Sequence, residues 1–396
     1  MDEETSTLTF EQFVSEATEQ VRKGNSLSGV IVFSENDAWR NFERVISRFN
    51  IESRIWTADQ IDTAQNDFFI LRFTKRADAT NRADARRRLF FIKVVTERES
   101  NQSCTTLYVF SYEGSELFRV FKSLVEKTRY MWRGWIGSRF LERFDEFVRS
   151  VYLKELGREG AEASTVLVKF VLETRDVKSK DRKGSSINYE KRSEEDLNKL
   201  RTFYWKEFAE LLYVKKGKYK ITTNARYFSV ALSDRTEFTL MEGDLLEFLA
   251  LFKYVLFYAR ELRDKFKKKI LINKSQRAVR ATNETLEFLS FDKIELIKID
   301  VDNPVISSWR DNLVNTFSID HLREFKLLNF VLQEGNPYFL AETIDLENGS
   351  RTYVSMVENS IRISPAIEQT EPSTISKLFS VLQSRVDPSI NLIERW

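Results

Sequence analysis

The stretch from Lys215 to Lys269 constrains the fold of this chain more strongly than any other. It contains short runs of alternating apolar and polar residues separated by turn residues, followed by a long run with helical periodicity. This pattern predicts a β-meander closed by an amphipathic helix. Because weaker versions of the same order occur before and after it, the sequence predicts an α+β fold: antiparallel β-meanders, each closed by an amphipathic helix, with a small α/β unit at the N-terminus.

In the central unit the predicted strands are residues 219–223 and 227–232, and Phe238 and Leu240 mark a third. A helix over residues 194–213 precedes the strands, and Gly217 is predicted to turn the chain between them. The closing helix carries apolar residues at intervals of four and three, which are Leu245, Leu249, Phe252, Leu256 and Ala259. Residues 260–280 are then predicted to contain the end of this helix and a basic connector.

Two further units show the same order. The first has predicted strands at 68–73, 89–95 and 106–112 and a helix from about Ser115. The last has strands at 337–345 and 351–357 around Asn348 and Gly349, which form the strongest short hairpin signal in the chain. Its helix is predicted from about Ser373. The units do not align closely, so they give no firm sign of duplication.

The predicted α/β unit consists of a strand at 30–33, a helix at 37–49 and a second strand at 51–56. It has no phosphate-binding loop, which favours an ordinary crossover over a nucleotide site. A length of 396 residues predicts more than one domain. We predict an N-terminal α/β domain at 1–156, a central meander domain at 164–280 and a C-terminal α+β domain at 281–396. Residues 175–192 have no apolar periodicity and are predicted to be a loop.

Composition excludes several kinds of chemistry. The net charge is +2, so a polyanionic partner would have to meet local basic clusters. The chain has one cysteine, which fits a reducing compartment, and it shows no signal peptide and no apolar run long enough for a membrane span. We therefore expect a cytoplasmic location, no membrane association and no cofactor.

The central meander has two chemically different faces, because successive side chains of a strand point to opposite sides. Tyr219 and Ile221 share one face with Phe228, Val230 and Leu232, and this face is predicted to pack on the closing helix. The other face is predicted to carry cations beside an aromatic ring, which are Lys218, Lys220, Thr222, Arg226, Tyr227 and Ser229. Cations for phosphates and a ring for base stacking are what a single-strand binder needs. The alternative is an ordinary sheet with a solvated lysine face.

The residues Lys218-Tyr219-Lys220-Ile221, Arg226-Tyr227-Phe228-Ser229-Val230 and Phe238-Thr239-Leu240, followed by Asp244-Leu245-Leu246, resemble the repeat of the PC4/PUR-alpha class of single-stranded nucleic-acid-binding proteins. The resemblance covers about residues 215–258. It implies a curved antiparallel meander with a following helix, and binding through the exposed sheet face. It does not indicate which residues make contact.

Three other clusters are candidate binding sites. Arg86, Arg87 and Arg88 enter a predicted strand, and guanidinium groups suit phosphates. Arg129, Trp132 and Arg133 interleave cations with a large ring, although a helix corner with core tryptophans explains them equally well. The basic stretch 260–280 adds Arg263, Lys267 and Lys268, with helix capping as the alternative role.

Catalysis has little support in the sequence. His321 and Cys104 are the only histidine and cysteine, which excludes a usual zinc site. Acidic residues that could hold magnesium are more typical of a solvated strand face: Asp292, Glu295, Asp300 and Asp302. We thus expect a non-enzymatic protein that binds single-stranded nucleic acid. A protein–protein interaction subunit is the alternative, a metal-dependent nuclease is the third hypothesis, and homo-oligomerisation is a further expectation.

Overall fold

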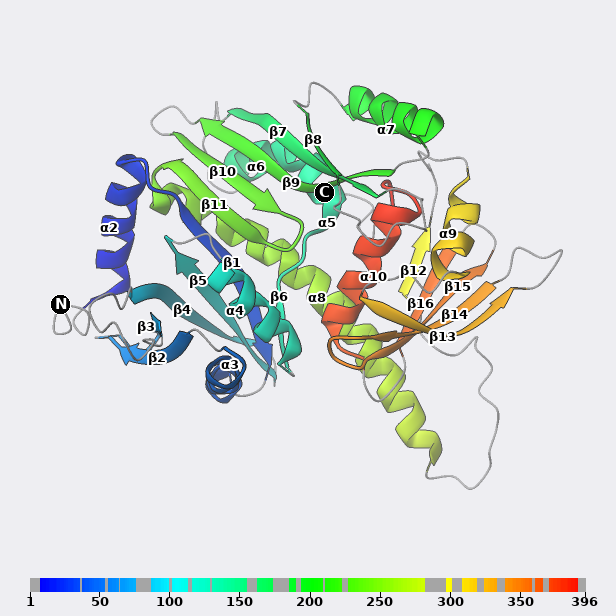
Figure 1. The fold of residues 1–396 in the computed structure, drawn as a ribbon, viewed down its shortest axis with the longest axis horizontal. Coiled ribbons are helices and arrows are strands. Elements are labelled where there is room, and N and C mark those ends of the chain that lie inside the picture. Colours follow the sequence, from blue (N-terminus) through cyan, green and yellow to red (C-terminus); the bar gives the residue numbers. More distant parts are fainter. Residues whose placement is uncertain are drawn as a thin grey trace. The chain divides into compact units, whose positions relative to one another are not determined.

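The computed structural model describes residues 8–35, 38–53, 56–63, 65–75, 87–99, 102–112, 116–128, 130–154, 162–173, 185–189, 194–208, 211–222, 227–281, 297–300, 308–318, 324–332, 339–357, 360–365 and 370–390. Helices and antiparallel sheets succeed one another along the chain (Figure 1), which confirms the predicted α+β class.

Contacts divide the chain into two compact units, each assembled from separate stretches. Unit 1 comprises Met1–Gly134, Val148–Ser164 and Lys218–Phe257. Unit 2 comprises Trp135–Phe147, Thr165–Gly217 and Tyr258–Trp396. The three predicted domains are continuous stretches, and their independent folding stays a prediction.

Unit 1 contains the first meander and the part of the second from Lys218 to Phe257. Helix α2 (Phe10–Arg22), strand β1 (Leu27–Glu35) and helix α3 (Ala38–Glu52) come first. The first meander follows and is closed by helix α4 (Glu116–Lys127); its strands are β2 (Trp56–Asp62), β3 (Phe68–Lys75), β4 (Arg87–Glu99) and β5 (Gln102–Ser111). The second meander is closed by helix α8 (Leu245–Ala281), and its strands are β9 (Leu211–Thr222), β10 (Tyr227–Ser233) and β11 (Glu237–Gly243).

Strand β1 joins these two meanders into one sheet. It pairs antiparallel with β5 on one side and with β11 on the other, where Leu27 lies opposite Leu240. Within unit 1 the strand order is β2-β3-β4-β5-β1-β11-β10, followed by the end of β9, and the short strand β6 (Met131–Arg133) also pairs with β1. Residues of the predicted N-terminal and central domains therefore share a sheet, which the local patterns did not reveal.

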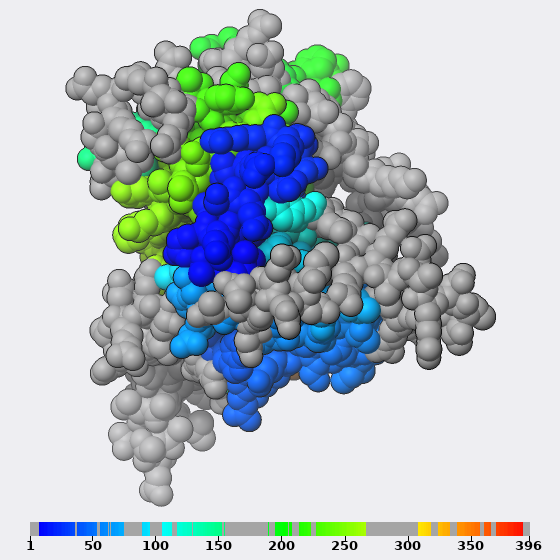
Figure 2. Space-filling model, turned by 90° about the vertical axis from the view of Figure 1, so that its left-hand side faces the viewer, coloured from blue at the N-terminus to red at the C-terminus, as the bar shows by residue number. Residues whose placement is uncertain are grey.

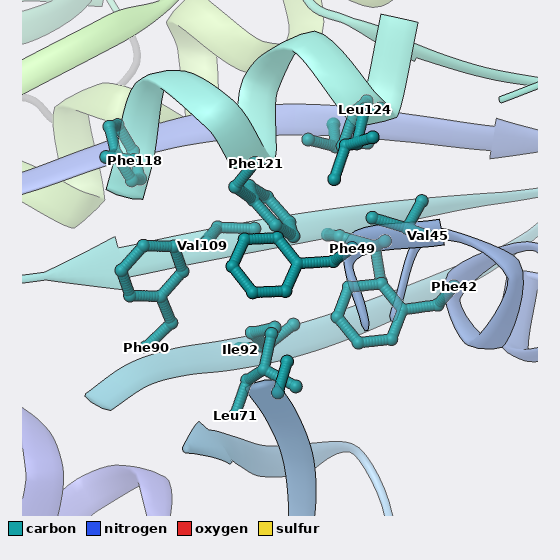
Figure 3. Close-up of a cluster of buried hydrophobic side chains, with 14 of the residues drawn as sticks. Phe42, Val45, Phe49, Leu71, Phe90, Ile92, Val109, Phe118, Phe121 and Leu124 are labelled. Carbon is teal, nitrogen blue, oxygen red and sulfur yellow. The ribbon is translucent and has the colours of Figure 1, made fainter. Parts of the chain in front are cut away.

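The first meander is buried on both faces because helices cover each of them. Helices α3 and α4 lie on one face, where Phe42 and Phe121 pack with Phe90, Ile92 and other apolar side chains (Figure 3). Helix α2 lies on the other face, where the ring of Phe13 stacks on Phe91 at 4.4 Å between centroids. Neighbouring residues of β4 thus point into opposite cores, which explains the unbroken apolar run Leu89-Phe90-Phe91-Ile92.

The second meander packs on α8 as the sequence predicts. The ring of Phe238 on β11 lies 4.8 Å from Phe252 and 4.9 Å from Phe248 on the helix. Figure 2 shows this side of unit 1, with α2 in dark blue between the lime-green surface of residues 230–257 and the lighter blue surface of β2 and β3. Helix α2 and the first part of α8 therefore cover neighbouring parts of one sheet face.

The predicted strand at 51–56 is wrong. Helix α3 continues to Glu52, and β2 begins at Trp56. The side chain of Asn50 explains the sharp change, because it accepts a hydrogen bond from the Ala58 backbone N–H at 2.6 Å and donates one to the Ala58 carbonyl at 2.9 Å. The Asn50 side chain, near the end of α3, thus makes the two hydrogen bonds to the Ala58 backbone that a neighbouring strand would otherwise make.

Unit 2 corrects three further predictions. The predicted loop 175–192 contains strand β8 (Ser185–Tyr189), which pairs antiparallel with β7 (Glu162–Glu173). Helix α7 (Glu194–Phe208) ends before residue 213, and β9 already begins at Leu211, so that Gly217 lies within a strand and makes no turn. A tertiary hydrogen bond from the Val214 backbone N–H to Ser138 Oγ, at 2.9 Å, supports the strand in place of the helix.

A buried ion pair holds helix α5 (Gly137–Glu142) to α7. The carboxylate of Glu142 is fully buried and accepts hydrogen bonds from both terminal nitrogens of Arg201, whose side chain is also buried. Arg139 Nη1 and Ser138 Oγ donate to the same carboxylate, each at 3.1 Å. Helix α6 (Phe144–Lys154) follows α5, so the helix predicted at 139–153 is broken at Arg143.

The third meander forms a five-stranded sheet in unit 2, of order β12-β16-β15-β14-β13. Helix α9 (Trp309–Ser318) precedes the meander and α10 (Pro372–Arg385) follows it. The strands are β12 (Ile297–Asp300), β13 (Phe325–Leu332), β14 (Phe339–Asp345), β15 (Arg351–Val357) and β16 (Ser360–Pro365). The predicted hairpin at Asn348 and Gly349 is confirmed: β14 and β15 pair across it, and Gly349 has a φ of +74°, which favours glycine.

Candidate nucleic-acid interface

The end of strand β9 that belongs to unit 1 separates a buried face from an exposed one. Tyr219 and Ile221 are fully buried, while Lys220 and Thr222 are exposed and Lys218 is half-buried. This alternation confirms the two faces that the sequence predicts. The apolar side of the strand fixes its position in the core, so its lysines are presented by a rigid element.

In strand β10 the predicted buried face is confirmed, but the exposed face is smaller than the sequence predicts. Phe228, Val230 and Leu232 are buried as predicted, and the side chain of Tyr227 is 48% exposed. Ser229, predicted on the exposed face, is buried instead. The exposed surface of the second meander therefore lies around the start of β10 and does not extend along the whole strand.

The exposed residues of the two strands meet at Tyr227. The ammonium of Lys220 lies 5.5 Å from the centroid of the Tyr227 ring, within the range of a cation–π interaction. We call the surface formed by Lys218, Lys220, Thr222 and Tyr227 the lysine–tyrosine face. It combines a fixed aromatic ring with two cations on one side of a sheet.

A glycine on the neighbouring strand makes this arrangement possible. Gly243 has a φ of +96° and lies opposite Phe228 in the antiparallel ladder. A Cβ at this position would fall 2.2 Å from the carbonyl oxygen of Tyr227. The backbone at Tyr227 thus lies so close to β11 that only glycine, which has no Cβ, fits at position 243.

Several predicted contact residues cannot be placed on this face. Arg86, Arg129 and Arg226 lie outside the described residues. The backbones of Arg87 and Arg88 lie in β4, opposite Thr74 and Phe73, and those of Lys267 and Lys268 lie in α8. The side chains of these four residues are outside what the structure describes, so their role stays a prediction.

Trp132 and Arg133 have structural roles. The indole of Trp132 is 4% exposed, and its centroid lies 6.1 Å from that of Phe33, so protein encloses the ring. Arg133 forms ion pairs with Glu126 and Glu237. Burial alone would lower the pKa of Arg133, but these two carboxylates outweigh burial and raise it. Both residues are therefore left out of the lysine–tyrosine face.

The basic stretch after the second meander is helical throughout. Helix α8 continues to Ala281, so the connector predicted within residues 260–280 is wrong. Arg263 belongs to unit 2 and donates from Nε to Asp264 Oδ1 at 2.7 Å. Because Lys220 and Tyr227 belong to unit 1, the predicted alignment of this stretch with the sheet face stays a prediction.

Two exposed apolar residues on α8 were not identified from the sequence. Leu246 is 59% exposed and Phe257 is 66% exposed. They are eleven residues apart, which is three helical turns, so they lie on the same side of the helix. Both residues stand in the sequence as apolar positions outside the predicted buried stripe, but periodicity alone does not tell whether another element covers such a position.

The described part of the chain contains no candidate metal site and no candidate membrane-spanning helix. Within it, no three histidine, cysteine or acidic side chains are grouped to hold a metal ion. Asp292, Glu295, Asp302 and His321 lie outside the described residues. Of the helices that the structure describes, none combines the length and apolar character of a membrane span.

Comparisons with known proteins add no relative. No protein-family model matches the chain, and no curated protein matches it by sequence.

Proposed function

We propose that this chain binds single-stranded nucleic acid through the lysine–tyrosine face. The observation that carries the proposal is the half-exposed ring of Tyr227 with the Lys220 ammonium 5.5 Å from its centroid. A base can stack on such a ring while the adjacent cation meets the phosphate that follows it. Lys218, on the same side of β9, supplies a second cation for the backbone of the strand.

The geometry favours a single strand over a duplex. In a duplex the flat faces of the bases are stacked on one another, and a ring on a protein surface does not reach them. Unpaired bases can turn outward and stack on aromatic side chains, with little dependence on sequence. Stacking on a single ring and charge contacts to phosphates depend little on base identity, so we propose binding with weak sequence preference.

The resemblance to the PC4/PUR-alpha class supports the same proposal. That class implies a meander followed by a helix, with nucleic acid on the exposed sheet face. The second meander has this order in β9, β10, β11 and α8, and the first and third meanders repeat it with other residues. The likeness of order supports the proposed binding, while the contacts are argued from Lys218, Lys220 and Tyr227.

Titration of the wild-type chain with fluorescent oligonucleotides tests the proposal. We expect a single-stranded oligonucleotide to bind at low salt, and we expect the logarithm of the binding constant to fall linearly with the logarithm of salt concentration. A duplex of the same sequence should bind more weakly, because the tyrosine ring cannot stack on paired bases. Absence of binding at low salt would remove the proposal.

The second candidate is a protein–protein interaction subunit, and the exposed side chains of Leu246 and Phe257 on α8 favour it. A large apolar side chain that stays exposed on a helix can fill a pocket of a partner and contribute much of the binding energy. Purification from a nuclease-treated lysate, followed by size exclusion with light scattering, separates the two candidates. A co-purifying protein without excess absorbance from nucleic acid would favour the second.

A further inference from the structure

Strand β11 contains an irregularity next to the lysine–tyrosine face. Leu240 is fully buried, and strict alternation along the strand would turn the side chain of Glu242 toward the same core. The pairing with β10 shifts at this point, because Val230 lies opposite Leu240 while Ser229 lies opposite Glu242. Met241 is therefore an extra residue in β11, which makes a β-bulge.

The bulge turns Glu242 away from the core and onto the side of the sheet that carries Tyr227. Residues directly opposite each other share a face, so Glu242 lies on the face of Ser229, and Tyr227 is two residues before Ser229 on the same strand. Glu242 is accordingly exposed, and no described residue forms an ion pair or a hydrogen bond with its carboxylate. Tyr227 and Glu242 are diagonal neighbours, roughly 7–8 Å apart along the ladder, which is within reach of an aromatic and a long side chain.

Three neighbouring strands thus present three kinds of group in order across one face. The lysines are on β9, the Tyr227 ring is on β10 and the Glu242 carboxylate is on β11, and these strands lie side by side (Figure 1). The outer two strands are about 10 Å apart, which is twice the spacing of neighbouring strands. A nucleotide has its own groups in a matching order, which is phosphate, base face and hydrogen-bonding edge of the base. With its phosphate at β9 and its base on Tyr227, a nucleotide directs this edge toward Glu242.

We propose that Glu242 selects the base that stacks on Tyr227, by accepting a hydrogen bond from an exocyclic amino group of that base. Cytosine, adenine and guanine carry such a group, whereas thymine and uracil do not. At the position of the cytosine amino group, thymine has a carbonyl oxygen, which repels a carboxylate. The inference rests on the proposed binding at the lysine–tyrosine face, and it adds a preference of a few-fold to binding that otherwise depends little on base identity.

Titration with two pyrimidine strands tests this preference, because cytosine and thymine are similar in size and both stack weakly. The measurement is made at low salt and at a mildly alkaline pH, which keeps cytosine uncharged. We expect the wild-type chain to bind an oligocytidine strand at least about threefold more tightly than an oligothymidine strand of equal length. Glu242→Gln should bring this ratio close to one, because a glutamine amide can accept from an amino group and can also donate to a carbonyl.

Glu43→Gln is the matched control, because Glu43 is an exposed glutamate of unit 1 on α3 and its substitution removes the same charge. It should keep the wild-type ratio, since a general effect of charge changes both affinities without changing their ratio. Equal binding of the two strands by the wild-type chain overturns this inference and leaves the proposed function standing. So does a ratio in Glu242→Gln that equals the ratio in Glu43→Gln. Binding of neither strand at low salt overturns the proposed function and this inference together.

Discussion

Replacing Glu142 by alanine lowers the free energy of unfolding of unit 2 by about 3–5 kcal/mol, because it leaves the buried guanidinium of Arg201 without its carboxylate. The side chains of Glu142 and Arg201 are 0% and 1% exposed, so water cannot replace the lost partner. Urea unfolding and hydrogen exchange of α5 and α7 would measure the change.

The neighbouring pair Arg143–Glu146 provides the control. Arg143 Nη2 lies 2.7 Å from Glu146 Oε2, so this ion pair is also close, but both of its side chains are partly exposed. Glu146→Ala should therefore change the free energy of unfolding by no more than about 1 kcal/mol. Equal effects of the two substitutions would contradict a special role for the buried pair.

The same carboxylate makes unit 2 sensitive to acid. Burial by itself would raise the pKa of Glu142, but the charges and hydrogen bonds of Arg201 and Arg139 outweigh it and hold the pKa below the ordinary value of 4.5. A lowered pKa in the folded state contributes stability above the unfolded-state pKa, and this contribution is lost as the pH falls through the folded-state pKa. In Glu142→Gln, the dependence of the free energy of unfolding on pH below about 4.5 should be shallower.

The second large effect is expected at Lys377 on α10. Its ammonium is buried and lies 3.0 Å from Asp345 Oδ2, beside Glu347, at the turn between β14 and β15. Thr374 Oγ1 donates to the same oxygen of Asp345 at 2.8 Å. Lys377→Met should lower the free energy of unfolding by about 3–5 kcal/mol, because Asp345 remains as a buried charge.

A double-mutant cycle with Asp345→Asn separates the ion pair from simple packing. The double variant should lose at least about 1 kcal/mol less than the sum of the two single losses, because neither charge is then left alone. Lys23→Met, which breaks the exposed pair Lys23–Glu19, is the control and should change the free energy of unfolding by at most about 1 kcal/mol. Additive losses at Asp345 and Lys377 would contradict the expected coupling.

Local patterns predicted most elements of the meanders because each strand and helix has its own periodicity. The alternation in β9 and β10 placed Tyr219, Ile221 and Phe228 in the core and Lys220 on the surface correctly. The turn residues Asn348 and Gly349 located the last hairpin, since a positive φ at this position favours glycine.

Features that depend on distant partners could not be predicted in this way. The pairing of β1 with β11 joins residues more than two hundred positions apart, and nothing within either strand specifies it. Charged residues on helices are usually solvated, and nothing in the local sequence marks Glu142, Arg201 and Lys377 as buried. The burial of Ser229 and Trp132 is likewise decided by tertiary packing.

The most direct test of the central claim compares two variants of equal charge. Lys218→Gln/Lys220→Gln/Tyr227→Ala removes the lysine–tyrosine face, while Lys23→Gln/Lys199→Gln removes two exposed lysines outside every candidate binding cluster. Loss of two phosphate contacts should make the salt slope for a single-stranded oligonucleotide shallower by about 1.4, and loss of stacking should weaken binding by a further ~1–3 kcal/mol. The control should bind with nearly the wild-type slope. Equal affinities and slopes for the two variants would contradict binding at Lys218, Lys220 and Tyr227.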